Sequence, residues 1–254
     1  MDDQQVQIQQ ICDKYARNNV RLNGVKYRLM QPSDVEQIAY VGSTTYCNSE
    51  PCTKRVIDRY PNELVRLQRE QREWLISQTH SQSIHHTSVV ATIINPHTNT
   101  EQVIAFSQSF PQPPADDDNT IPDLVIKPVI QLMTQLKAAW LQQWSQSPDR
   151  TLLIQDLAVS DEWNGHGVAT DLVQITVDIA RSMQYNALIA EASSASQNVF
   201  LKAQFQSANN IVYNEFVYDG ERMFADIAPF SEHYPVPAAH LMYRKLDQQT
   251  NKIM

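Results

Sequence analysis

Two glycines separated by one residue mark the stretch of this chain that is best suited to binding a ligand. Gly165 and Gly167 flank His166, and the whole sequence of 254 residues contains only five glycines. Glycine accepts steep backbone turns and lets a ligand approach bare N–H groups closely. When such a turn opens a helix, its N–H groups and the helix dipole attract a phosphate or pyrophosphate. The glycine pair therefore indicates an anion-binding turn.

Glu50 is a second residue whose position suits chemistry, because it directly precedes Pro51. Proline disfavours helical backbone at the residue before it, so we expect Glu50 to be extended, with its carboxylate on a loop. A partly buried carboxylate with a raised pKa can act as a general base, either directly or through a water molecule. A plain loop or capping role is the alternative for Glu50.

The glycine pair lies between a predicted strand and a predicted helix. Residues 151–159 are apolar and β-branched over the length of a strand, with no helical spacing. After the turn, apolar residues recur at steps of three and four, as on one face of a helix: Val168, Leu172, Ile175, Ile179 and Met183. The turn therefore opens a helix, as an anion site of this kind requires.

Shorter patterns predict further elements on both sides of this unit. β-rich runs predict strands over residues 25–30, 88–94, 102–110, 187–192, 211–217 and 238–246. Helical spacing and caps predict helices that begin near residue 35 and cover residues 62–79, 124–144 and 193–207. Pro- and Asp-rich residues 111–122 predict a loop. The helix over 124–144 is thus an expected insertion ahead of the central strand.

Composition and charge restrict the classes of partner. The chain has 42% hydrophobic and 19% charged residues, as globular proteins do. Its net charge of −8 and pI of about 5.3 disfavour nucleic acid and mildly favour small cationic substrates such as amines. No apolar run approaches about 18 residues, and the first residues lack the basic and apolar regions of a signal peptide. Three cysteines without zinc spacing suit a reducing compartment. We therefore expect a cytoplasmic protein that binds no membrane and no metal.

The segment Asn164–Ala169 resembles the Arg/Gln-x-x-Gly-x-Gly/Ala signature of the GNAT N-acetyltransferases, which holds the pyrophosphate of acetyl-CoA. A P-loop would need a Gly-Lys-Ser/Thr ending, and a dinucleotide fingerprint would need a third Gly or Ala where Thr170 stands. Residues 199–205 look like the family's Leu-Tyr-x-Lys-x-Gly-Phe block, although Phe200 replaces the tyrosine. The pair Glu50–Pro51 resembles the Asp-Glu-Pro-Leu block of insect-type arylalkylamine N-acetyltransferases.

This resemblance implies a mixed α/β architecture, the GNAT fold, with a central mixed sheet of about six or seven strands flanked by helices. It covers most of residues 25–246, which we expect to form the acetyltransferase domain. Residues 1–24 are expected to be a peripheral helical segment and residues 247–254 a tail. The implied cosubstrate is acetyl-CoA, and the oligomeric state, monomer or dimer, stays open.

The resemblance also implies roles for individual residues. Glu50 matches the family's catalytic glutamate. Ser193 and Ser196 lie where hydroxyl groups assist proton transfer or orient the substrate, and capping of the following helix is the alternative for each. In the family, a backbone N–H on the central strand polarises the thioester carbonyl and the glycine turn holds the pyrophosphate. The residues at these places are Leu157, Ala158, Val159, Asn164, Gly165, His166, Gly167, Val168 and Ala169.

The function that this resemblance implies is acetyl-CoA-dependent N-acetylation. The expected acceptor is a primary amine of a small molecule, of the arylalkylamine or polyamine type, which attacks directly while Glu50 acts as general base. Two alternatives stay open. One is a non-catalytic CoA-binding module, which the missing tyrosine at Phe200 favours, and the other is a protein N-acetyltransferase.

Overall fold

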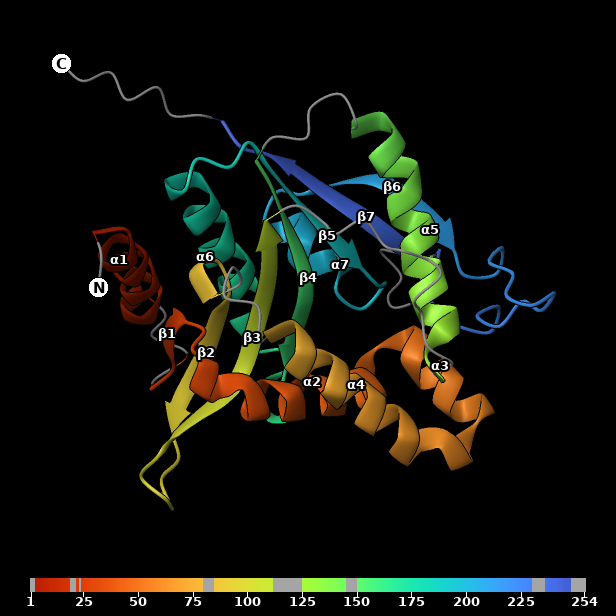
Figure 1. Ribbon diagram of the computed structural model, residues 1–254, viewed down its shortest axis with the longest axis horizontal. Coiled ribbons are helices and arrows are strands. Elements are labelled where there is room, and N and C mark those ends of the chain that lie inside the picture. Colours follow the sequence, from red (N-terminus) through yellow and green to blue (C-terminus); the bar gives the residue numbers. More distant parts are fainter. Residues whose placement is uncertain are drawn as a thin grey trace.

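Seven strands form one sheet at the centre of the structure: β1 (Lys26–Leu29), β2 (Val89–Ile94), β3 (Glu101–Pro111), β4 (Thr151–Val159), β5 (Ala187–Ala192), β6 (Gln206–Val212) and β7 (Ala238–Lys245). This computed structural model describes residues 3–18, 22, 24–79, 85–111, 125–144, 150–229 and 236–247. The strand order is β1-β2-β3-β4-β5-β7-β6 (Figure 1). Neighbouring strands are antiparallel except β4 and β5, which are parallel.

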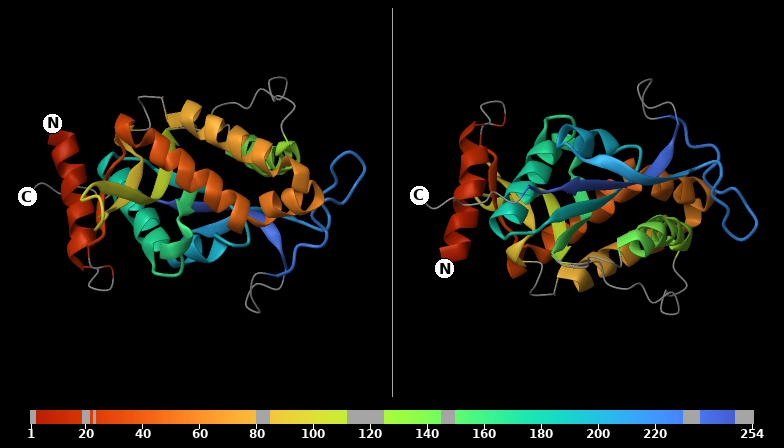
Figure 2. Two further views of the ribbon diagram at one scale, coloured as in Figure 1. Left: turned by 90° about the horizontal axis from the view of Figure 1, so that it is seen from below. Right: turned by 90° about the horizontal axis from the view of Figure 1, so that it is seen from above.

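The helices are α1 (Asp3–Asn18), α2 (Val35–Ser49), α3 (Pro51–Arg59), α4 (Leu64–Thr79), α5 (Lys127–Trp144), α6 (Val168–Ser182) and α7 (Gln197–Lys202). They cover both faces of the sheet, as Figure 2 shows. α6 and α7 pack on one face, α2, α4 and α5 pack on the other, and α1 lies against β1 and α6. A parallel pair such as β4–β5 needs cover on both faces, and the first four residues of both strands are buried.

The parallel strands pair only over their first halves. Their register runs from Thr151 opposite Ala187 to Ile154 opposite Ala190, although both strands continue beyond these residues. On its other side β4 stays paired to β3 from Leu152 to Val159, with a shift in register that leaves Gln155 as a bulge. In the described part of the chain, the facing edges of β4 and β5 therefore have no strand partner beyond Ile154. We call this opening the β4–β5 fork.

Most predicted elements occur where the sequence placed them, including the helix inserted ahead of the central strand, α5. Two predictions near the C-terminal side are wrong. The helix expected over 193–207 is only α7, because Gln204 adopts left-handed backbone (φ 62°) just after the helix ends. The strand expected over 211–217 begins at Gln206 and ends at Val212. The first residues of β6 are polar and exposed because β6 is an edge strand, so they lack an apolar alternation.

Several expectations fall partly outside the described residues. The predicted loop over 111–122 is described only at Pro111, and the predicted tail over 247–254 only at Asp247. The N-terminal helix α1 buries Ile8 and Cys12 in the core that it shares with α6. Within the ranges that the structure describes, no helix has the length and apolar character needed to cross a membrane.

Candidate functional site

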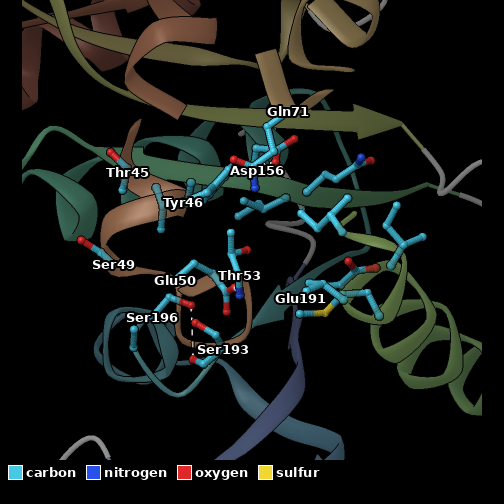
Figure 3. A pocket seen from close by; sticks show the side chains of 18 of the residues that line it. Thr45, Tyr46, Ser49, Glu50, Thr53, Gln71, Asp156, Glu191, Ser193 and Ser196 are labelled. Carbon is cyan, nitrogen blue, oxygen red and sulfur yellow. Dashed lines mark hydrogen bonds between the residues drawn. The ribbon is translucent and has the colours of Figure 1, made fainter. Parts of the chain in front are cut away.

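A cavity of about 450 Å³ opens at the β4–β5 fork. Its wall is made by α2, α3, α4, α5, both strands of the fork and residues in and just before α6 and α7 (Figure 3). Apolar side chains, among them those of Trp74, Val129 and Met133, share this wall with several buried polar groups. The cavity therefore brings together segments from both halves of the sequence.

Glu50 stands between α2 and α3 and lines the cavity. Its backbone is extended (φ −78°, ψ 119°), as expected before Pro51. The carboxylate caps α3, because Oε1 accepts the N–H of Cys52 at 3.1 Å and Oε2 accepts the N–H of Thr53 at 2.6 Å. Burial raises the pKa of Glu50, since the loss of solvation outweighs these hydrogen bonds. Glu50 thus combines the capping role with a place on the cavity wall.

Ser193 and Ser196 follow the end of β5 and also line the cavity. Ser196 directly precedes α7, but its side chain makes no capping hydrogen bond to that helix. Its hydroxyl instead donates to the carbonyl oxygen of Ser193 at 3.4 Å. Figure 3 draws both serines on the same side of the cavity as Glu50. The three predicted catalytic residues therefore lie on one cavity wall.

The turn that opens α6 has the backbone that its glycines suggest. Gly165 and Gly167 have positive φ angles of 78° and 94°, and no described atom lies within 4 Å of where a Cβ would stand on either. The His166 ring is turned onto the carbonyl oxygen of Asn164, with Nδ1 at 3.0 Å. The Val168 side chain is buried, which leaves only its main chain for the turn. Since the first N–H groups of a helix have no acceptor within it, α6 presents a positive end at this open turn.

The cavity reaches this turn, because Asn164 and Ala169 both line it. Of the predicted residues on the central strand, Leu157 and Val159 line the cavity too. Ala158 instead is buried on the sheet face that α2 covers. The structure therefore brings the strand edge, the helix N-terminus and the predicted catalytic residues to a single site.

The sequence prediction missed a buried acid in the middle of β4. Asp156 is 4% exposed and lines the cavity. The hydroxyl of Tyr46 donates to its Oδ1 at 2.8 Å, whereas Oδ2 has no hydrogen-bond partner among the described residues. Burial raises the pKa of Asp156 to about 7, with help from the negative charge of Glu191 and against the effects of Tyr46 and Lys137. The signal was present in the sequence, because Asp156 interrupts the apolar run of the predicted strand.

An ion pair in the same wall joins α5 to β5. Nζ of Lys137 lies 3.2 Å from Oε1 of Glu191, and both side chains are largely buried. The described wall thus carries one lysine, Lys137, and four carboxylates, those of Glu50, Glu70, Asp156 and Glu191. This excess of negative charge favours a cationic ligand. No cluster of three or more His, Cys, Asp or Glu residues that could hold a metal ion occurs in the described ranges.

No protein-family model and no curated protein sequence matches the chain. Solved structures do match it at low sequence identity. Arylalkylamine N-acetyltransferase 2 from Aedes aegypti aligns with a TM-score of 0.67 and 17% identity, over 89% of this chain and 100% of that one. The polyamine N-acetyltransferase of Drosophila melanogaster aligns with a TM-score of 0.62 and 15% identity, over 87% and 100%. The C-terminal condensation domain of Ebony, solved with beta-alanyl-dopamine, gives 0.66 and 12%, over 87% and 99%. The chain thus has the GNAT fold that its sequence predicted.

Proposed function

We propose that this protein transfers the acetyl group of acetyl-CoA to a primary amine of a small molecule. One observation carries the proposal: a single cavity connects the open glycine turn at the start of α6 with buried carboxylates at the β4–β5 fork. A pyrophosphate suits the first end, and a cationic amine suits the second. Two N-acetyltransferases of small amines share the fold, which supports the same class of reaction.

In this proposal the cosubstrate occupies the α6 side of the fork. The N–H groups around Gly167 hold the pyrophosphate, because the turn is open and α6 adds its positive end. The pantetheine arm runs along the free edge of β4 at Leu157–Val159, as an added strand would. A main-chain N–H on this edge polarises the thioester carbonyl and stabilises the negative charge that develops there.

Proton removal from the amine is the step that most needs catalysis. An alkylamine has a pKa near that of lysine, about 10.4, so reaching the neutral form at pH 7 costs roughly 4–5 kcal/mol. The leaving thiol has a pKa of about 8.5, so its release as thiolate costs only about 2 kcal/mol. A base therefore contributes more to the rate than an acid does.

Glu50 is our candidate for this base. Each of its oxygens accepts one helix N–H, and a carboxylate oxygen has a second acceptor site that can face the ammonium group or an intervening water. The raised pKa of Glu50 brings its proton affinity closer to that of the amine. Ser193 and Ser196, on the same wall, orient the amine or pass its proton on.

A non-catalytic CoA-binding module is the second candidate. Phe200, at the place of the family's tyrosine, is 2% exposed, and its ring packs edge-on against Phe205 at 5.3 Å between centroids. It therefore has no proton to donate to a departing thiolate. Since the thiolate needs little assistance, this absence does not by itself prevent transfer.

Amine-dependent release of CoA thiol separates these candidates. The purified protein is incubated with acetyl-CoA and, in turn, arylalkylamines, linear polyamines and a peptide with a free N-terminus. Our proposal predicts thiol release and an acetylated product with at least one small amine, and a much slower reaction with the peptide. Tight CoA binding without any amine-dependent thiol release would identify the binding module instead. Preferential acetylation of the peptide would indicate a protein N-acetyltransferase.

A further inference from the structure

Asp156 is placed where the β4–β5 fork opens. It lies one residue after the bulge at Gln155 and two residues beyond the last pair that β4 forms with β5. Tyr46 satisfies one oxygen of the carboxylate, and the other oxygen is buried with no donor among the described residues. A buried carboxylate oxygen without a donor is costly, so a ligand that donates to it would stabilise the site.

The charges around Asp156 specify the kind of ligand. Glu191, on the facing strand, already forms an ion pair with Lys137, and among the described residues these two are the charged groups that shift the pKa of Asp156. Two carboxylates thus share one ammonium group in a largely buried site. The other acids of the wall are engaged elsewhere. Glu50 caps α3, and Glu70 accepts from Arg66 at 2.7 Å and from the main chain of Val125 at 3.0 Å. The uncompensated negative charge therefore falls at Asp156, and a positive group would balance it.

We propose that Asp156 and Glu191 bind a second positively charged group of the amine substrate, so that the preferred acceptor is a diamine. This inference rests on the proposed function, in which Glu50 deprotonates the amino group at the other end of the ligand. The same cavity wall includes Val129, Ile130 and Met133 of α5, which suit the methylene chain of a linear diamine. A singly charged arylalkylamine would place a neutral ring or chain against the open oxygen of Asp156.

Binding of a cation at this site should release a proton from Asp156. A positive charge beside Asp156 favours its ionised form and lowers its pKa, so a proton leaves when the ligand binds. With a pKa of about 7 in the free protein, Asp156 is mostly protonated at pH 6 and mostly ionised at pH 8.5. Binding should therefore release up to about 0.9 proton at pH 6 and almost none at pH 8.5. The burial of Tyr46 raises its pKa well above the ordinary value, so it stays neutral over this range.

Calorimetry without acetyl-CoA tests the site independently of acetyl transfer. Cadaverine and n-pentylamine have the same chain length and differ by one charge, so their affinities isolate the second ammonium group. The wild-type protein should bind cadaverine at least about tenfold more tightly than pentylamine, and Asp156→Asn should reduce this ratio to below about threefold. The control Asp58→Asn removes an exposed carboxylate of α3 and should keep the wild-type ratio. Titrations in buffers of different ionisation enthalpy should show the proton release in the wild type and not in Asp156→Asn.

Three results would contradict the diamine site. Equal affinity for the two ligands in the wild type, tighter binding of phenethylamine than of cadaverine, or a folded Asp156→Asn protein that keeps the preference would each overturn the diamine site. Should Asp156→Asn not fold, Glu191→Gln serves in its place, and an unchanged preference there has the same meaning. Diamine binding without any acetyl transfer would instead contradict the proposed function.

Discussion

Glu50 and Asp156 are held in different ways, and this difference separates their roles. Glu50 accepts two N–H groups at the start of α3, which fixes the orientation of its carboxylate. Among the described residues, Asp156 has a single donor, Tyr46, and its other oxygen has no hydrogen-bond partner. Burial raises the pKa of both groups. Glu50 is thus a carboxylate in a fixed position, whereas the charge of Asp156 depends on what occupies the cavity.

Glu50→Gln tests the general base. The amide keeps the size of the side chain and one of its two capping acceptors but cannot take a proton, so kcat should fall by about 10²–10⁴-fold while acetyl-CoA affinity stays near normal. Raising the pH should partly restore the rate, because more of the amine is then neutral. Glu73→Gln, at an exposed position of α4, is the matched control. Steady-state rates from pH 6 to 10 decide the matter, and a kcat within about threefold of wild type over this range would exclude Glu50.

Asp156 should also leave a signature in the pH dependence of stability. Its pKa is about 7 in the folded protein and about 3.9 in an unfolded chain, so the folded state holds the extra proton between these values. The stability that this proton contributes is complete below about pH 4 and is lost as the pH rises to about 7, a change of about 4 kcal/mol. The Asp156→Asn protein has no carboxyl group at this position, so its stability should not fall in this way as the pH rises. Urea unfolding from pH 4.5 to 8.5 should show the two proteins diverging as the pH rises, whereas parallel curves would contradict the buried, titrating carboxylate.

The sequence identified Glu50 but not Asp156, for a physical reason. Proline restricts the backbone of the preceding residue locally, so the extended conformation of Glu50 follows from its neighbour alone. A single acid within an apolar strand is compatible with either face of the sheet. Only the packing of α2 against β4, which brings Tyr46 over the strand, shows that Asp156 is buried.

At the scale of elements, the glycine turn depends on neighbouring residues, whereas the fork depends on how strands distant in the sequence pair. The turn was predictable, because positive φ and the start of a helix are local properties of glycine and of the apolar spacing that follows. The fork was not, because it depends on where β5 stops pairing with β4 and on the bulge opposite β3. The short helix α3 was also missed, since its nine residues give too few turns for a periodic pattern.

Gly167→Val tests the turn as an anion site. The side chain enters open space in the structure, so it meets a bound pyrophosphate and not the protein itself. Acetyl-CoA affinity should fall at least about tenfold by calorimetry. The control is Gly220→Val. Gly220 also has a positive φ, 80°, and open surroundings, so valine introduces similar backbone strain there but far from the glycine turn. Equal affinities in the two folded variants would show that strain, and not contact with the ligand, explains any loss.

At the scale of the whole molecule, the cavity depends on segments that are far apart in the chain. The N-terminal half supplies α2, Glu50 and α4, the inserted helix α5 supplies an apolar wall with Lys137, and the later residues supply the fork and the glycine turn. Figure 1 shows α5 standing beside the C-terminal strands, opposite the edge that carries α1. The net charge of −8 agrees in sign with the four carboxylates of the wall. An acidic molecule with an acidic cavity attracts cationic ligands over both long and short distances.

The central claim is that acetyl-CoA and an amine meet in this one cavity. A bisubstrate analogue, in which the CoA sulfur is joined through an acetyl linker to one nitrogen of cadaverine so that the other nitrogen keeps its charge, tests it directly. If both ends bind together, the analogue should bind at least about 100-fold more tightly than CoA, because the second contact is then intramolecular. Gly167→Val and Asp156→Asn should each weaken the analogue, whereas only Gly167→Val should weaken CoA. An analogue that binds wild-type protein no more tightly than CoA would show that the amine does not bind at the β4–β5 fork.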